Sequence, residues 1–285
     1  MEKIAIMTDV NAGTDYLDEQ YDITVLRSMI NFGDEHYVDG VDIKADEFFD
    51  RLQKTDVIPS TSAPTVGETM NYVEKLIDEG YTDIIMYAIS FKLSCIGTMV
   101  QSVAEEYEDK IKIHVVDTKR SVFEQAYFAI NAYKMAKEGK SVKEILERSD
   151  FLINHSRELF IVDDLKYLVK NGRLSGFSGF MGSLLQIKPI LELNDEGAIV
   201  VRQKERTLKR GLSELHDIVA NEIKDGKKVY LTIYHTCRYD DAKELEKQYL
   251  KDFPNVVKSH VISITPAVGA HIGCGVLGCG YIILE

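Results

Sequence analysis

The sequence predicts an α/β protein of two domains, and three observations lead to that prediction. Apolar runs alternate with amphipathic stretches through the first half, the order that builds a mainly parallel, doubly wound sheet. After about residue 150, two strand-like runs flank the turn Asn194–Gly197, which indicates a mixed sheet with hairpin pairing. The chain has 285 residues, enough for two domains of ordinary size. We therefore expect an N-terminal parallel α/β domain over 1–150 and a C-terminal mixed α/β domain, flanked by helices, over 151–285.

The first half contains three strand candidates that are apolar throughout, as expected for parallel strands buried on both faces. These candidates are residues 3–10, 83–90 and 112–118. Each is followed, directly or after an intervening segment, by a stretch with apolar residues at helical spacing. The expected helices are residues 65–80, a segment starting at Ser94, and residues 123–137.

The second half mixes strands and helices without a regular alternation. The expected strands are residues 158–164, two within 188–207, and then 227–235, 255–263 and 280–285. The expected helices are residues 207–224 and 240–250, and the acidic pair Asp163–Asp164 is expected to start a further helix.

Composition excludes several classes of protein. The formal charge of −12 and the lack of a basic stripe argue against binding to nucleic acid. No apolar run approaches the roughly 18 residues that cross a bilayer. The opening MEKIAIMTDV lacks the basic and apolar regions of a signal peptide, and four cysteines do not form a disulfide framework. We therefore expect a protein of the reducing cytoplasm.

Three loops of the first half are expected at the carboxyl ends of strands, where open α/β sheets bind ligands. They are TDVNAG (8–13), PSTSAPT (59–65) and SFKLSC (90–95), and the second is dense in hydroxyls, including Thr61 and Ser62. Ser94 is expected at a helix N-terminus, where a hydroxyl and free N–H groups suit a small anion. The alternative is that Ser94 and Thr65 only cap their helices.

The closing segment ITPAVGAHIGCGVLGCGYIILE places His271 among five glycines. Because glycine destabilises regular elements, the pattern predicts a loop shaped around a ligand, and the alternative is an irregular turn with a satisfied histidine. Arg173 follows an expected helix, and Arg206 lies near a strand end. Together they could meet a phosphoryl group or an acidic partner, or each could be a solvated surface charge.

Catalysis is the competing interpretation of these residues. Ser94 as nucleophile and His271 as base would suit a hydrolase or acyl transferase, but no G-x-S-x-G turn surrounds Ser94. A metal site of His271, Cys274 and Cys279 is only weakly indicated, because the spacing lacks a second ligand pair. We expect no metal and no cofactor.

Nine spans, taken in their order along the chain, carry a resemblance to a known family: FGDEHYVDGVDI (32–43), PSTSAPT (59–65), ISFKLS (89–94), VVDT (115–118), FIVDDLKYLVKNGRLS (160–175), LLQIKPILEL (184–193), RT (206–207), HTCRYDDAKEL (235–245) and VGAHIGCGVLG (268–278). Together they resemble the DegV family of bacterial proteins, whose characterised members are fatty acid-binding subunits of a fatty acid kinase. The resemblance implies two α/β domains that bury one long acyl chain between them, with no catalysis by the protein itself. A separate ATP-dependent kinase would phosphorylate the presented carboxylate to an acyl phosphate. A lipid-sensing module without a kinase partner is a third interpretation.

The resemblance also implies roles for six residues. The ligand-binding candidates are Thr61, Ser62, Ser94, Arg173, Arg206 and His271. Thr61 and Ser62 match the family's TS pair, Ser94 the second serine of S-S-G-L-S-G, and His271 the histidine of H-x-G-x-G. Arg173 matches G-R-[IL]-S and Arg206 the later R-T.

The chain departs from the family pattern around this expected site. Phe91 and Lys92 replace a serine and a glycine, and Cys95 replaces a glycine. Ala63 stands where glutamine is usual, Cys274 where proline is usual, and the opening loop reads TDVNAG rather than T-D-S-[TS]-A-D. We expect Phe91, Lys92 and the Cβ of Cys95 either to narrow the mouth of the site or to change which lipid fits, and Lys92 to add a charge at the carboxylate.

Overall fold

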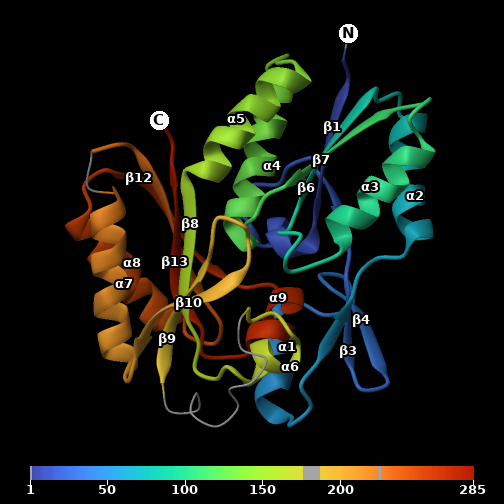
Figure 1. The fold of residues 1–285 in the computed structure, drawn as a ribbon. Helices are drawn as coiled ribbons and strands as arrows, with labels where there is room; N and C mark the ends of the chain where they lie inside the picture. Colours follow the sequence, from blue (N-terminus) through green and yellow to red (C-terminus); the bar gives the residue numbers. More distant parts are fainter. Residues whose placement is uncertain (1, 176–186, 224–225) are drawn as a thin grey trace.

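The computed structural model describes residues 2–175, 187–223 and 226–285 (Figure 1). The helices are α1 (Ala45–Lys54), α2 (Val66–Asp78), α3 (Ile96–Glu106), α4 (Val122–Lys137), α5 (Val142–Asn154), α6 (Lys166–Lys170), α7 (Leu208–Ile223), α8 (Tyr239–Asp252) and α9 (Pro266–Ile272), with short 3-10 turns η1 (Val10–Ala12) and η2 (Thr14–Tyr16). The strands are β1 (Ile4–Asp9), β2 (Thr24–Leu26), β3 (Met29–Phe32), β4 (Glu35–Val38), β5 (Ser60–Ser62), β6 (Asp83–Ala88), β7 (Lys112–Asp117), β8 (Ser156–Ile161), β9 (Lys188–Leu193), β10 (Ile199–Glu205), β11 (Val229–His235), β12 (Val256–Ser263) and β13 (Leu277–Ile283).

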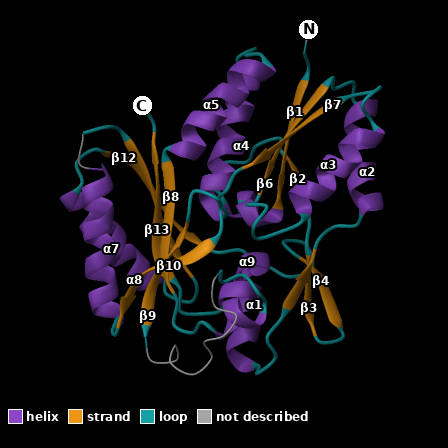
Figure 2. Ribbon diagram, viewed as in Figure 1, coloured by secondary structure: helices purple, strands orange, loops and turns teal. Residues whose placement is uncertain are grey.

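A parallel sheet of order β2-β1-β6-β7 forms the first half of the molecule. All residues of β6 are buried, because helices cover both faces of the sheet. Helices α2 and α3 pack on one face, and α4 and α5 cover the other (Figure 2). Helix α2 begins with a capping box in which Thr65 and Glu68 bond each other's backbone N–H groups. The expected doubly wound sheet is confirmed.

A mixed sheet of order β10-β9-β8-β13-β11-β12 forms the second half; β11 and β12 pair in parallel, and the other neighbouring strands pair antiparallel. The predicted hairpin turn joins β9 to β10, where the Gly197 N–H donates to the Asn194 carbonyl at 3.0 Å. The Asn194 side chain also accepts from the Ala198 N–H at 2.8 Å. Helices α7 and α8 cover the outer face, so five layers alternate between helix and sheet (Figure 2). The predicted mixed, helix-flanked sheet is confirmed.

Helices α4 and α5 are shared between the two sheets. One apolar cluster contains Ile85 and Tyr87 of the parallel sheet together with Phe160 and Tyr230 of the mixed sheet. The chain passes from α5 to β8 through the single residue His155. The division at residue 150 therefore falls inside α5, and a separation into two domains stays a prediction.

A third, antiparallel sheet of order β4-β3-β5 was not expected from the sequence. Its strands have three or four residues each, too short to show a clear pattern, and β4 (EHYV) and β5 (STS) are also largely polar. The prediction that 59–65 is a loop was wrong for Ser60–Ser62, which pairs with β3. Phe48 and Phe49 of α1 and Ala270 of α9 belong to one apolar cluster with Ile30 of β3.

The glycine-rich closing segment is also more regular than predicted. Helix α9 starts at Pro266 and includes Gly269. Glycine is needed at this position because a Cβ would lie 2.6 Å from the Phe49 ring. Gly278 and Gly280 belong to β13. The prediction of one loop was therefore wrong for Gly269, Gly278 and Gly280, whereas Gly273 and Gly275, with φ of 76° and 86°, lie in the turn between α9 and β13.

Other boundaries differ only slightly from expectation. Helix α3 begins at Ile96, with Cys95 at the N-cap in place of Ser94. Helix α6 begins at Lys166, two residues after the predicted acidic pair, and the Lys166 N–H donates to the Asp164 carboxylate at 2.8 Å. Lys224, expected to end a helix, and residues 184–186 of the span LLQIKPILEL lie outside the described residues.

Candidate functional site

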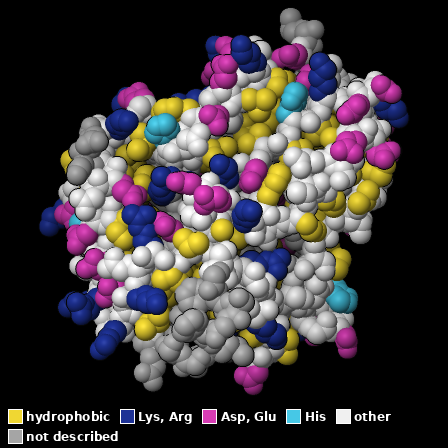
Figure 3. Space-filling model, in the orientation of Figure 1, with side chains coloured by type: hydrophobic (Ala, Val, Ile, Leu, Met, Phe, Trp, Pro, Cys, Tyr) yellow, Lys and Arg dark blue, Asp and Glu magenta, His cyan; other side chains and the backbone are white. Residues whose placement is uncertain are grey.

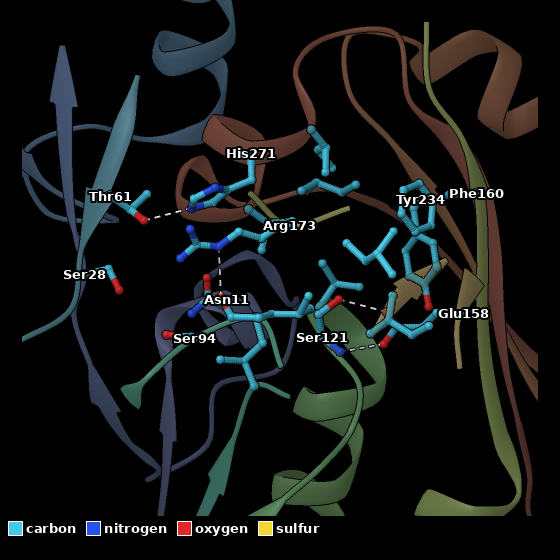
Figure 4. A pocket seen from close by; sticks show the side chains of 18 of the residues that line it. Asn11, Ser28, Thr61, Ser94, Ser121, Glu158, Phe160, Arg173, Tyr234 and His271 are labelled. Atoms are coloured by element: carbon cyan, nitrogen blue, oxygen red, sulfur yellow. Dashed lines mark hydrogen bonds between the residues drawn. The ribbon is translucent and has the colours of Figure 1, made fainter. Parts of the chain in front are cut away.

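A cavity lies where α9, the parallel sheet and the mixed sheet meet, and Figure 4 shows the side chains that line it. Its enclosed volume is about 80 Å³, and the space extends to about 800 Å³ when the open mouth is included. One end, here called the His271 end, is polar and is lined by Asn11, Ser28, Thr61, Ser94, Arg173 and His271. The opposite end, here called the Glu158 end, is lined by Ser121, Glu158, Phe160 and Tyr234. The rest of the lining is apolar and includes Leu193, Ile199, Ile264, Val268 and Ile272.

His271 and Thr61 meet across the cavity, although they are 210 positions apart in the chain. The His271 Nε2 lies 2.8 Å from the Thr61 Oγ1. Burial and the neighbouring Arg173 lower the pKa of His271 to about 4, so the ring is neutral at pH 7. Its buried Nδ1 has no hydrogen-bond partner among the described residues.

Arg173 supplies the positive charge of the His271 end. It follows α6, and its Nε donates to the Leu93 carbonyl at 3.1 Å while Nη1 donates to the Asn171 carbonyl at 2.6 Å. These bonds hold the guanidinium beside His271 and above Ser94 (Figure 4). Among the described residues that line the cavity, Arg173 is the one lysine or arginine. The arrangement suits an anion at this end.

The buried side chain of Asp9, at the end of β1, accepts hydrogen bonds from two segments near Arg173, one containing Asn11 and one starting at Ile89. Its Oδ1 accepts from the Asn11 N–H at 3.1 Å and from the Asn11 side-chain amide at 2.7 Å. Its Oδ2 accepts from the Ile89 N–H at 2.8 Å, at the start of the loop that carries Ser94. Burial raises the pKa of Asp9, opposed by these hydrogen bonds. The Ser94 hydroxyl accepts from the Ile96 N–H at 3.3 Å and keeps its own proton to donate to a ligand.

The structure brings together four of the six residues that the sequence nominated: Thr61, Ser94, Arg173 and His271. Ser62 is exposed, because side chains alternate along β5 and Thr61 takes the inward position. Its hydroxyl accepts from the Asn31 amide at 3.1 Å instead. Arg206 is exposed between β10 and α7 and does not line the cavity.

The expectation that Phe91 and Lys92 narrow the mouth was wrong. Phe91 packs against α3, where a Cβ on Gly97 would meet its Cδ1 at 2.6 Å. Lys92 is exposed, as is Cys95, and none of the three lines the cavity. The bulky substitution is therefore absorbed by the absence of a side chain at Gly97.

Cys274 approaches Cys237 and not Cys95. The two Sγ atoms are 2.7 Å apart, next to the C-terminal end of α9. Their mutual hydrogen bond lowers the pKa of Cys237 to about 7 and raises the pKa of Cys274. Cys279 is buried in β13. Within the described ranges, no three His, Cys, Asp or Glu side chains gather as metal ligands would.

Sequence reasoning missed five polar residues of the lining: Asn11, Ser28, Ser121, Glu158 and Tyr234. Asn11 lies in the loop 8–13, which was nominated as a whole. Glu158 carried a readable signal, since it opens the apolar run ELFIV of a strand that the sequence predicts. An acidic side chain that stays with such a strand is buried only where partners satisfy it.

Asp39 fixes the N-terminus of α9 and so the position of His271. It is fully buried, and its Oδ2 accepts from the Ala267 N–H at 2.7 Å, a favourable site for a carboxylate at a helix N-terminus. Its Oδ1 has no partner among the described residues. Burial raises the pKa of Asp39 to about 7.

This shift predicts a pH dependence of stability. Between pH 4 and pH 7 the folded state keeps a proton on Asp39 that the unfolded chain has released, so rising pH favours unfolding. At about 1.4 kcal/mol per pH unit, the free energy of unfolding falls by about 4 kcal/mol through this group. Asp39→Asn cannot ionise and is expected to lack that fall. Urea unfolding of both proteins from pH 4 to 8 measures it.

Asp34→Asn, at an exposed turn, is the matched control, and its unfolding free energy is expected to follow the wild type across this range. If the free energy of unfolding changed with pH in the same way in the wild type and in Asp39→Asn, the raised pKa would belong to another residue. That result would contradict its assignment to Asp39.

The surface shows no gathering of charge by sign on the face in Figure 3, where basic and acidic side chains are interspersed over the described residues. None of the helices in the described ranges combines the length and the apolarity that a bilayer crossing requires.

Known proteins are similar to this chain over nearly its whole length. A family model described as "Uncharacterised protein, DegV family" matches residues 3–284. A DegV domain-containing protein of Staphylococcus aureus is 32% identical over 286 residues, covering 98% of this chain and 97% of its own. The crystal structure of a fatty acid-binding DegV family protein from Streptococcus agalactiae superposes with a TM-score of 0.90 at 30% identity, covering 99% of both chains. DegV of Bacillus subtilis, a fatty acid-binding protein, superposes with a TM-score of 0.90 at 26% identity, covering 99% of this chain and 100% of its own. The chain belongs to the DegV family.

Proposed function

We propose that this protein binds one fatty acid, with the carboxylate at the His271 end and the acyl chain along the apolar wall. The observation that carries the proposal is the cavity itself, in which one cation and several hydroxyls face an apolar interior. The similar proteins of Streptococcus agalactiae and Bacillus subtilis are described as fatty acid-binding, which supports the same ligand class here.

A carboxylate leaves water only at a cost unless charge and hydrogen bonds replace its hydration. Arg173 offers the charge, and the hydroxyls of Thr61 and Ser94 offer donors. His271 is neutral without an anion because burial and Arg173 lower its pKa. A bound carboxylate opposes both effects and allows the ring to donate as well.

The acyl chain supplies most of the affinity. Each buried CH₂ contributes about 0.8 kcal/mol, so a long chain gives roughly 10 kcal/mol before ordering costs are subtracted. Leu193 of β9, Ile199 of β10 and Val268 of α9 come from three different elements and form part of the apolar lining. Rigid strands and a helix therefore hold the wall in place.

The geometry favours binding over hydrolysis. His271 Nε2 is bonded to Thr61 and not to Ser94, and Nδ1 has no carboxylate to orient the ring within the described residues. A Ser/His nucleophile needs both contacts. We infer that catalysis belongs to a separate ATP-dependent kinase that phosphorylates the presented carboxylate.

A reconstitution tests this function. The protein, loaded with dodecanoate or hexadecanoate, is incubated with ATP and the fatty acid kinase of its own organism, and acyl phosphate is trapped with hydroxylamine. Acyl hydroxamate is expected only when both proteins, fatty acid and ATP are present. Binding without hydroxamate would instead support a lipid-sensing module.

The hydrolase alternative has its own readout. The protein alone is expected to leave p-nitrophenyl esters intact. Turnover that Ser94→Ala abolishes and His271→Ala reduces would overturn the binding assignment.

A further inference from the structure

The Glu158 end of the cavity carries the buried polar side chains of Glu158, Ser121 and Tyr234 beside the Phe160 ring, where a simple acyl chain would place its methyl group. Glu158 is 2% exposed and projects from β8. Its Oε1 accepts the Ser121 N–H at 2.6 Å and its Oε2 accepts the Ser121 hydroxyl at 2.8 Å. These two bonds come from one residue, and the carboxyl group has further lone pairs to offer.

A second buried carboxyl group lies behind the first. Glu124 of α4 is 0% exposed and accepts a hydrogen bond from the Tyr234 hydroxyl. Its Oε1 has no partner among the described residues. The backbone makes room for the pair at Gly280, where a Cβ would lie 2.6 Å from the Glu124 Cδ. The two carboxyl groups and the Tyr234 hydroxyl are thus part of the packed interior. Of these residues, Tyr234 and Glu158 line the cavity (Figure 4).

The nearest cation does not neutralise these carboxyl groups by a direct bond. The nitrogens of buried Arg120 donate to the hydroxyl and carbonyl of Ser156 and to the carbonyls of Lys119 and Asn194. Burial raises the pKa of Glu158 to about 7 and that of Glu124 above its usual range. At neutral pH, Glu158 can therefore accept a hydrogen bond as a carboxylate or exchange one as a carboxylic acid.

A plain hydrocarbon end fits poorly here. A methyl group against Glu158 and Tyr234 displaces water from polar atoms and offers them no hydrogen bond in return. A hydroxyl group at the same point can donate to a carboxylate and can accept from a carboxylic acid, so it suits both states of Glu158. The lining between the two ends remains apolar and calls for hydrocarbon.

We propose that the preferred ligand is a fatty acid carrying a hydroxyl group at its far end, which bonds Glu158 while the carboxylate lies at Arg173 and His271. This inference rests on the proposed function and names the ligand class of that same cavity. Glu158 is the residue that sets the preference, and Ser121 holds its carboxyl group in place.

Matched pairs of ligands test it. Calorimetry on the delipidated full-length protein compares decanoic, dodecanoic, tetradecanoic and hexadecanoic acids with their ω-hydroxy forms. At the length that spans the cavity, the ω-hydroxy acid is expected to bind about tenfold or more tightly than its parent, since one well-placed hydrogen bond to a charged group contributes that much. An apolar tunnel end would give the opposite order, because it would desolvate the hydroxyl without a partner.

Two variants assign the effect to Glu158. Glu158→Leu is expected to invert the ratio within a pair, whereas Glu158→Gln keeps an acceptor oxygen and is expected to retain the preference for the hydroxyl. The ratio of two affinities on one variant does not depend on its folded fraction, so reduced stability does not obscure it.

The outcomes separate the two claims. Parent acids that bind tightly and better than their ω-hydroxy forms at every length would overturn this inference and leave the proposed function standing. A ratio unchanged in Glu158→Leu would overturn the role of Glu158. If no acid of either series binds, the proposed function fails, and this inference fails with it.

Discussion

Arg173→Gln is expected to weaken fatty acid binding about 100-fold, the largest effect of any single change in the cavity lining. Arg173 is the one cation among the described residues that line the cavity, and its Nε and Nη1 are held by the Leu93 and Asn171 carbonyls. Glutamine keeps polarity but leaves a buried carboxylate without an opposite charge, a loss of about 3 kcal/mol. Calorimetric titration with hexadecanoate measures it.

Arg206→Gln is the matched control, because Arg206 is exposed and does not line the cavity. Its affinity for the same acid is expected to equal that of the wild type. Equal losses in both variants would show that the arginines act through overall charge. If Arg173→Gln bound hexadecanoate as tightly as the wild type, the carboxylate would have to lie away from the His271 end.

Gly278→Ala is expected to lower the free energy of unfolding by about 3 kcal/mol, because the added methyl group meets backbone atoms of the paired strand. A Cβ at this position of β13 would lie 2.6 Å from the Phe160 Cα and also against the Leu159 carbonyl oxygen of the paired strand β8. These are backbone atoms in the centre of the mixed sheet, and they cannot turn aside as a flexible side chain would. Urea unfolding followed by circular dichroism measures the loss.

Gly67→Ala is the control for Gly278→Ala. Gly67 lies in α2, where an added Cβ meets nothing within 4 Å, so alanine is expected to stabilise the helix by up to about 1 kcal/mol. The two substitutions add the same methyl group and are expected to have opposite signs. A Gly278→Ala protein as stable as the wild type would mean that β8 and β13 are farther apart than described.

The parts of the fold that the sequence predicts correctly are those with local causes. β6 reads as a strand because all of its residues are buried between two layers of helices. Helix α2 is predictable from its apolar spacing, and its start is fixed by the Thr65 and Glu68 capping box. The turn at Asn194 and Gly197 likewise carries its signal within four residues.

The parts that it does not predict depend on distant contacts. β5 is a strand because it pairs with β3, and its three residues alone show no strand pattern. The inward position of Thr61 rather than Ser62 follows from that pairing. Gly278 and Gly280 of β13 are needed because β8 and α4 lie very close to this strand, and no local sequence pattern reveals that proximity.

The site divides in the same way. Thr61, Ser94, Arg173 and His271 were nominated by residue type, position and family resemblance, and the fold brings them to one cavity end. The Glu158 end was missed because the partners Ser121 and Glu158 are 37 positions apart and meet only between α4 and β8.

The most direct test of the central claim, that the cavity holds a fatty acid, is native mass spectrometry of the protein purified without detergent, followed by denaturing extraction. We expect one bound molecule per chain, released on denaturation with the mass of a fatty acid, and mass addition when the emptied protein is mixed with such acids. A protein that carries no lipid and takes up neither plain nor hydroxylated fatty acids would contradict the assignment.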